Sequence, residues 1–289
     1  MLIAQITDIH LGFDQSNPDE HNRRRLDALL EAFVAMDPQP DLLLMTGDLA
    51  DVGNDDLSYA RLREAIAGLP FPAYPALGNH DERPAFRRNF PEIAPGAEDD
   101  FVQYVIDDFP VRIVVLDTLE MVRHGGSLCE VRIKWLRERL DEQPDRPTLI
   151  VLHHPPVETG LSWMGESADA PWMKRLAEVV SAHDNIVALI SGHLHRPMVT
   201  RFAGTILAVC AASAPQLALD LGTISEDLPD GRPMIVDDPP AFALHKWTGR
   251  DLLTHFGSLA NGQVLASYDT RMQPTVIHLL HERKYPGKF

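Results

Sequence analysis

Several carboxylate, amide and imidazole side chains follow short apolar runs in this chain, and together they could bind a cation. The run from Ile3 to Thr7 is followed by Asp8 and His10. Residues two apart in a strand point to the same side, so this carboxylate and imidazole can reach one point beyond the strand's end. One such pair is weak support for a metal site, because Asp-x-His also occurs by chance.

The same arrangement recurs after later apolar runs, where packing alone has no need for imidazoles. If His80 is left aside and one ligand is counted from the pair His153 and His154, the set offers four histidine nitrogens, two carboxylates and one amide oxygen. These donors suit divalent cations such as Zn, Mn, Fe or Co. Seven ligands are too many for one tetrahedral site, but with Asp48 shared they divide into four and four. The polar strand ends are Asp8 and His10, Asp48, Asn79 and His80, His153 and His154, and His193 and His195.

Alternating strands and helices must position these side chains. Apolar residues at helical spacing predict a helix over 22–36, and short wholly apolar runs are typical of strands covered on both faces. Ligands of open α/β sheets bind beyond the carboxyl ends of the strands, which is where the polar residues lie. Further helices are expected over 57–67, 130–140 (buried face Val131, Trp135, Leu136 and Leu140) and 171–183, and strands over 42–46, 73–77, 101–106, 111–116, 148–152 and 186–190.

Beyond about residue 198 the pattern changes to short strands and long connections. The acidic segment 214–241, rich in Pro and Gly, is expected to be a loop or cap, or an oligomer contact. No linker or repeat divides the chain, so we expect one α/β domain over 1–289, with a metal-binding core over 1–200 and C-terminal strands over 201–289. Those strands are predicted at 199–202, 205–209, 242–247, 263–267 and 275–280.

Composition excludes some classes of partner. Lys and Arg total 26 against 42 for Asp and Glu, a formal net charge of −16, which repels polymeric nucleic acid and anionic membrane surfaces. The two cysteines, Cys129 and Cys210, lack metal-site spacing and are expected to be buried free thiols. No apolar run reaches the roughly 18 residues of a membrane span, and the first polar pair lies too near the N-terminus for a cleavable signal. A cytoplasmic location is expected.

The ordered motifs resemble those of the calcineurin-like metallophosphoesterase superfamily. They cover residues 1 to about 200, and the chain is most similar to the bacterial cyclic-nucleotide and glycerophosphodiester phosphodiesterases (class III) of that superfamily. The resemblance implies an α/β/β/α fold, in which helices flank a two-sheet β-sandwich, with a C-terminal insertion or cap. The matching motifs are Asp8-Ile9-His10, Gly47-Asp48, Gly78-Asn79-His80-Asp81, His153, and Gly192-His193-Leu194-His195.

The resemblance also implies a role for each matching residue. His80 would be the active-site histidine that meets the leaving oxygen, Asp81 a structural or orienting partner of His80, and His154 a packing or supporting neighbour of His153. The expected cofactors are two divalent cations, of Fe, Mn, Zn or Co. Asp8, His10 and His195 would hold one cation, Asn79, His153 and His193 the other, and Asp48 would bridge them. The histidines outside the motifs are expected to be surface or core residues: His21, His124, His183, His245, His255, His278 and His281.

The implied activity is hydrolysis of small phosphodiesters, a 3′,5′-cyclic nucleotide or a glycerophosphodiester, by attack of a metal-bound hydroxide. The expected partners are that substrate and further copies of the chain in a homo-oligomer, a dimer or larger. A protein phosphatase fits less well because Asp51-Val52-Gly53 lacks the arginine typical of that class, and the net charge argues against a DNA nuclease. A broad-specificity phosphomonoesterase or nuclease of the same superfamily stays open as an alternative. A non-enzymatic scaffold is disfavoured, since scaffolds generally lose ligands.

Overall fold

The computed structural model describes residues 1–93, 96, 100–260 and 262–284. The chain forms two compact units, Met1–Leu259 and Ala260–Phe289. The single domain predicted over 1–289 therefore stays a prediction, and its residues 94–95, 97–99, 261 and 285–289 lie outside the described part. None of the helices described is both long and apolar enough to span a bilayer.

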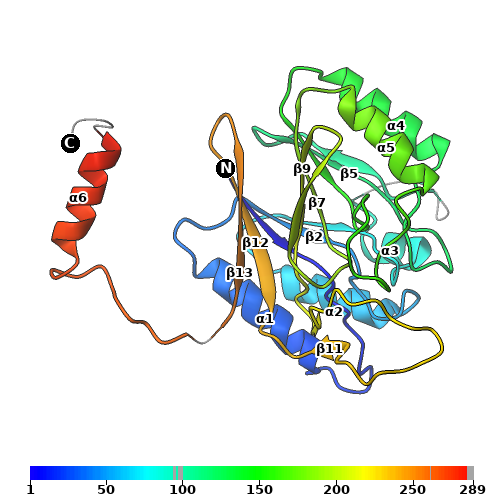
Figure 1. The fold of residues 1–289 in the computed structure, drawn as a ribbon, viewed down its shortest axis with the longest axis horizontal. Helices are drawn as coiled ribbons and strands as arrows, with labels where there is room; N and C mark the ends of the chain where they lie inside the picture. The colour runs from blue at the N-terminus through cyan, green and yellow to red at the C-terminus, as the bar shows by residue number, and fades with distance from the viewer. Residues whose placement is uncertain (94–95, 97–99, 261, 285–289) are drawn as a thin grey trace. The chain divides into compact units, whose positions relative to one another are not determined.

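Two mixed sheets build the first unit (Figure 1). One has the order β13-β12-β1-β2-β3, in which β1, β2 and β3 run parallel. The other has the order β4-β5-β6-β7-β9-β8, in which β5, β6, β7 and β9 run parallel. The strands are β1 (Leu2–Ile6), β2 (Leu42–Thr46), β3 (Ala73–Ala76), β4 (Tyr104–Ile106), β5 (Arg112–Val115), β6 (Thr148–Val151), β7 (Ile186–Ser191), β8 (Met198–Phe202), β9 (Thr205–Val209), β12 (Ala241–Trp247) and β13 (Leu252–Ser258).

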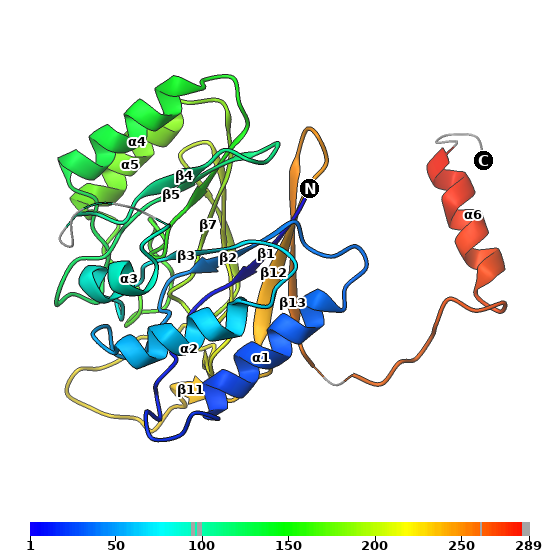
Figure 2. The ribbon, with the colours of Figure 1, turned by 180° about the vertical axis from the view of Figure 1, so that it is seen from behind.

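Alternating burial along the second sheet shows how the layers stack. Val115 and Val151 belong to the core that includes β1, β2, α1 and α2, whereas their neighbours Val114 and Ile150 belong to the core of α4 and α5. Successive side chains of a strand point to opposite faces, so the second sheet lies between the first sheet and α4 and α5. The predicted α/β/β/α sandwich is confirmed, as Figure 1 and Figure 2 show from opposite sides. The helices of this unit are α1 (His21–Val34), α2 (Asp56–Ile66), α3 (Arg83–Asn89), α4 (Glu130–Glu142) and α5 (Pro171–Ser181).

The segment 214–241 is mostly irregular but carries a short antiparallel pair, β10 (Gln216–Leu217) and β11 (Ile235–Val236). The guanidinium of Arg25 on α1 fastens this segment by donating to the carbonyls of Ser213 at 2.6 Å, Ala214 at 3.1 Å and Asp238 at 2.6 Å. Burial of a charged side chain is tolerated when its donors are satisfied in this way.

Two strand predictions at the C-terminal end are wrong. Residues 263–267 have no regular structure, and 275–280 lie within the helix α6 (Gln273–Lys284). A short apolar run cannot be assigned to strand or helix by periodicity alone. Here Pro274 falls in the first helical turn, where proline is favoured.

The buried face predicted for 130–140 is also partly wrong. Val131 is 67% exposed, while Arg132 is 1% exposed. The Arg132 guanidinium donates to the carbonyls of Asp117 and Leu119 and lies over the ring of Phe101, 4.4 Å from its centroid. These contacts turn a cationic side chain inward, which an apolar-periodicity argument does not detect. The helix α3 was not predicted.

Candidate metal centre

Side chains that follow strands of both sheets converge at one edge of the sandwich. Asp8 and His10 follow β1, and His195 follows β7. His195 Nε2 lies 3.4 Å from Asp8 Oδ1 and 3.2 Å from His10 Nε2. One nitrogen or oxygen from each of these residues lies within 4.8 Å of the others, which is close enough for all three to bind one cation.

A second group of donors adjoins the first. His153 Nε2 lies 3.2 Å from Asn79 Oδ1, and His193 Nδ1 lies 3.0 Å from the same oxygen. Asp48 lies between the groups, because its Oδ2 is 3.3 Å from His153 Nε2 and 3.6 Å from His10 Nε2. The structure thus brings together all seven residues that the motifs single out, with Asp48 in the shared position.

The histidine rings are oriented by bonds made outside the cluster. His153 Nδ1 donates to the Thr46 carbonyl at 2.8 Å, and His195 Nδ1 donates to the Pro215 carbonyl at 2.9 Å. His10 Nδ1 lies 3.3 Å from Asp51 Oδ1. A carbonyl can only accept, so Nδ1 of His153 and of His195 carries a proton, and Nε2 is the nitrogen that faces the cluster and can bind a cation. Metal-ligating histidines have this arrangement.

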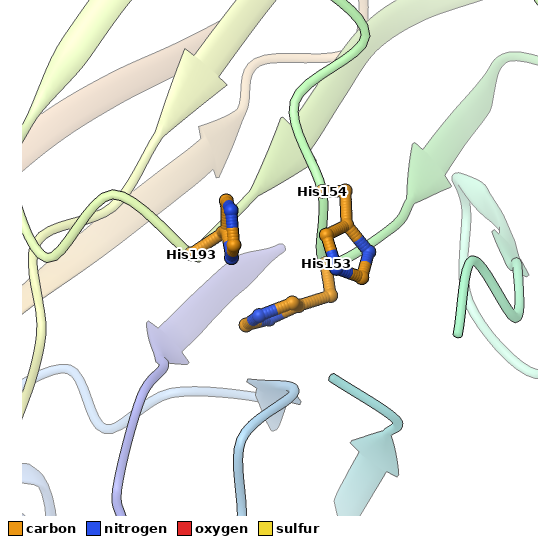
Figure 3. A group of neighbouring side chains, drawn as sticks. All are labelled: His153, His154 and His193. Atoms are coloured by element: carbon orange, nitrogen blue, oxygen red, sulfur yellow. The ribbon is translucent and has the colours of Figure 1, made fainter. Parts of the chain in front are cut away.

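His154 lies close enough to His153 and His193 to be considered as a ligand, but both of its nitrogens are engaged elsewhere. Nδ1 is 2.8 Å from Thr118 Oγ1, and Nε2 donates to the His124 carbonyl at 3.1 Å. Figure 3 shows His153 and His154 leaving the same loop in different directions, with ring planes 89° apart. Burial, and the positive charge of His153, hold the pKa of His154 well below its usual range. His154 is therefore a neutral neighbour of the donors.

The charges of the cluster fit bound cations. Among the described residues, Asp8 Oδ1 is buried and accepts no hydrogen bond. Burial by itself would lower the pKa of His153, but the Asp48 carboxylate raises it to about 9. Burial would likewise raise the pKa of Asp48, but His153 holds it well below its usual range. Two buried carboxylates thus draw positive charge into the cluster, and divalent cations would supply it.

The backbone at these donors adopts an uncommon conformation. φ is 49° at Asp8, 49° at His10, 50° at Asp48, 74° at His193 and 50° at His195. Residues other than glycine rarely adopt positive φ, and each instance costs about 1–3 kcal/mol. Such strain concentrates at functional sites, because the surrounding fold maintains it.

His80 borders the cluster, and one nitrogen or oxygen from each of His80, His10 and Asp48 lies within 4.8 Å of the others. Its Nδ1 donates to the Asp51 carbonyl at 2.8 Å, and its backbone N–H donates to Asp48 Oδ1 at 2.8 Å. Its ring meets that of His10 edge to face, with centroids 4.5 Å apart. The Nε2 of His80 is left for the cavity that this residue lines.

Of the two roles expected for Asp81, structural or orienting, the structure supports the structural one. The hydrogen bond that orients the His80 ring joins its Nδ1 to the Asp51 carbonyl and does not involve Asp81. The buried Asp81 carboxylate accepts from the backbone N–H groups of Leu49 and Gly78 and from the Tyr59 hydroxyl, at 2.8–3.2 Å. Burial, and then repulsion by Asp48, raise the pKa of Asp81 to about 6. Asp81 thus ties together the two loops that carry Asp48 and Asn79.

His124, predicted to be a surface or core residue, lies at the site. Its ring centroid is 4.7 Å from that of His193. It belongs to the irregular connection between β5 and α4, where no strand end or motif could have indicated it. Asn22 was also missed, and its side-chain amide donates to the His10 carbonyl at 2.8 Å. His245 lies elsewhere, buried between Gln5 and Thr254.

Comparison with known proteins gives consistent matches. The family model described as calcineurin-like phosphoesterase matches residues 1–197. The chain is 32% identical to a probable glycerophosphodiester phosphodiesterase of Arcobacter nitrofigilis, over 88% of this chain and 91% of that protein. It is 37% identical to a probable cyclic nucleotide phosphodiesterase of Rhodopseudomonas palustris, over 68% and 72%. Its fold is similar to that of a dimetal phosphatase from Danio rerio, with a TM-score of 0.60, 15% identity and coverage of 88% and 98%.

Proposed function

The chain belongs to the calcineurin-like phosphoesterase family, and we propose that it hydrolyses small phosphodiesters with two bound divalent cations. The convergence of seven metal-competent side chains from both sheets, with Asp48 between two groups, supports this proposal. The proposed ligands of one cation are Asp8, His10 and His195, and those of the other are Asn79, His153 and His193, with Asp48 shared.

The bound cations would lower the pKa of a water molecule so that it can attack phosphorus, and they would stabilise the phosphoryl oxygens. The chain's own residues supply the rest. His80 would protonate the leaving oxygen through Nε2, since its Nδ1 is held by Asp51. General acid catalysis of this kind typically contributes about 10²–10⁴-fold.

The proposed substrates are 3′,5′-cyclic nucleotides or glycerophosphodiesters, the two kinds that the names of the relatives indicate. A cavity of about 370 Å³ is lined by His80 and, from the segment 214–241, by Pro215, Leu217 and Ile235. We propose that this segment narrows access and so favours small esters. The homo-oligomer and the cytoplasmic location stay predictions.

A panel of esters tests the proposal. The metal-loaded protein is assayed with 3′,5′-cyclic AMP, glycerophosphocholine and bis(p-nitrophenyl) phosphate, and with p-nitrophenyl phosphate as the monoester, each with Mn, Zn, Co and Fe. We expect faster hydrolysis of diesters, and loss of both activity and bound metal in Asp48→Asn but not in the exposed control Asp251→Asn. Faster cleavage of the monoester would favour the phosphomonoesterase alternative. A folded, metal-loaded protein that cleaves no ester would refute the proposal.

A further inference from the structure

Two cavities border the metal centre. One, of about 370 Å³, is lined by His10, His80 and His195, and we call it the His80 cavity. The other, of about 450 Å³, is lined by His154 and His193, and we call it the His193 cavity. The side chains of His124, Trp163 and Met164 line both. Each volume is in the range that holds a small ligand.

The His80 cavity has apolar walls that come from separate segments. Phe13 follows β1, Trp163 lies between β6 and α5, and Leu217 and Ile235 face each other in the register of β10 and β11. Phe13 is 75% and Ile235 66% exposed, although each is a large apolar side chain. Exposed apolar side chains grouped beside a reaction centre indicate a binding surface for an apolar group.

The His193 cavity is more polar than the His80 cavity, although Trp163, Met164 and Trp172 also line it. Arg123 pairs with Glu166 at 3.0 Å, and Glu166 also accepts from the Trp172 indole N–H at 2.8 Å. Thr159 completes this wall. A hydroxylated or charged group can exchange hydrogen bonds with these side chains, whereas an apolar ring would displace water from them without replacing its hydrogen bonds.

The polarity of the cavities bears on which ester bond breaks. His80 is the residue proposed to protonate the leaving oxygen, and it lines the apolar cavity and not the polar one. The departing alcohol must lie near His80, so its substituent enters the apolar cavity. The arm that stays on phosphorus then extends into the polar cavity.

We infer that the departing alcohol of the substrate carries an aromatic base that packs against Phe13 and Ile235, while a small polar arm is retained on phosphorus. This inference rests on the proposed function. In a diester that joins a nucleoside through O5′ to glycerol, the oxygen of water bonds to phosphorus and the bond between phosphorus and O5′ breaks. O5′ keeps the electron pair of the broken bond and takes a proton from His80. The attacking water loses one proton, which replaces the proton that His80 gave up, so the overall reaction is balanced. The products are the nucleoside and glycerol phosphate.

Adenosine 5′-phosphoglycerol tests the inference, because both of its ester oxygens belong to primary alcohols of similar reactivity. The metal-loaded full chain is given this diester, and the products are separated by chromatography. We expect adenosine and glycerol phosphate to exceed AMP and glycerol by about 5- to 100-fold, the size of a base-stacking contribution. The product ratio is set within each turnover, so it does not depend on the fraction of active protein.

Variants identify the walls responsible. Phe13→Leu and Ile235→Ala are expected to move the product ratio toward one, whereas Phe256→Leu, which changes a 40% exposed residue outside both cavities, leaves it unchanged. Equal products, an excess of AMP, or a ratio insensitive to Phe13→Leu and Ile235→Ala would overturn the inference. So would cleavage of bis(p-nitrophenyl) phosphate without cleavage of adenosine 5′-phosphoglycerol. Failure to cleave any diester would instead refute the proposed function.

Discussion

The close approach of Gly78 to Asp48 predicts that one added methyl group disables the metal centre. In Gly78→Ala the new Cβ would lie 2.2 Å from Asp48 Oδ1 and 2.4 Å from the Asp48 backbone nitrogen. An ordinary contact of a Cβ is 3.4–4 Å, so Asp48 must move by about 1 Å. Rotation of the side chain alone cannot relieve the clash, because the backbone nitrogen is also too close.

The size of the effect follows from the position of Asp48. Its Oδ2 faces His10 and His153, and its Oδ1 accepts from the His80 backbone N–H. Displacement therefore disturbs both groups of donors and the proposed acid together. A misplacement of about 1 Å commonly costs about 10²-fold in rate, and overpacking of a buried site costs about 1–3 kcal/mol of stability.

The assay compares Gly78→Ala with Gly68→Ala, whose new Cβ would meet nothing within 4 Å. We measure kcat/KM for bis(p-nitrophenyl) phosphate at saturating Mn, the metal content of the protein, and the melting temperature. Gly78→Ala is expected to lose about 10²-fold in kcat/KM together with bound metal, at a temperature where it is still folded. The steric reasoning would be refuted if Gly78→Ala kept its full metal content and a kcat/KM within about threefold of that of Gly68→Ala, a loss far smaller than the one expected.

Three further substitutions have defined outcomes. His80→Ala is expected to lower kcat by about 10²–10⁴-fold for diesters with poor leaving groups and to leave the metal content unchanged, whereas loss of metal would make His80 a ligand. Arg25→Met leaves buried carbonyls unpaired, so it should destabilise the fold by about 2 kcal/mol or more and speed proteolysis within 214–241. The half-exposed control Arg24→Met should change neither the stability nor the rate of proteolysis. Burial lowers the pKa of His245 to about 4 in the folded protein, whereas a histidine in the unfolded chain has a pKa of about 6.5. The unfolded state therefore binds a proton first as the pH falls. The free energy of unfolding should therefore drop by up to about 3 kcal/mol between pH 6.5 and 4, and denaturant titrations of His245→Gln should show a smaller drop.

The sequence predicts the strand-end donors well because their signal is local. The run Leu42–Thr46 and the residue Asp48 are neighbours in the chain, and the parallel pairing of β1 with β2 follows from the same alternation of strands and helices. Contacts between distant segments have no such local signal. Neither the approach of His124 to His193 nor the burial of Arg132 against Phe101 can be read from spacing.

The helix α6 was missed for another reason. Residues 276–280 are apolar enough to suit a strand, and a short apolar run does not by itself decide between strand and helix. In the described part of unit 260–289, no strand is available to pair with this run.

The division of the donors between two sheets has a consequence for synthesis of the chain. His193 and His195 are translated roughly 180 residues after Asp8 and His10, so each proposed cation lacks a ligand until two-thirds of the polypeptide has been made. A nascent chain cannot assemble either complete coordination shell early. Completion of either shell then requires closure of the second sheet upon the first, which makes correct tertiary assembly the condition for a complete metal centre.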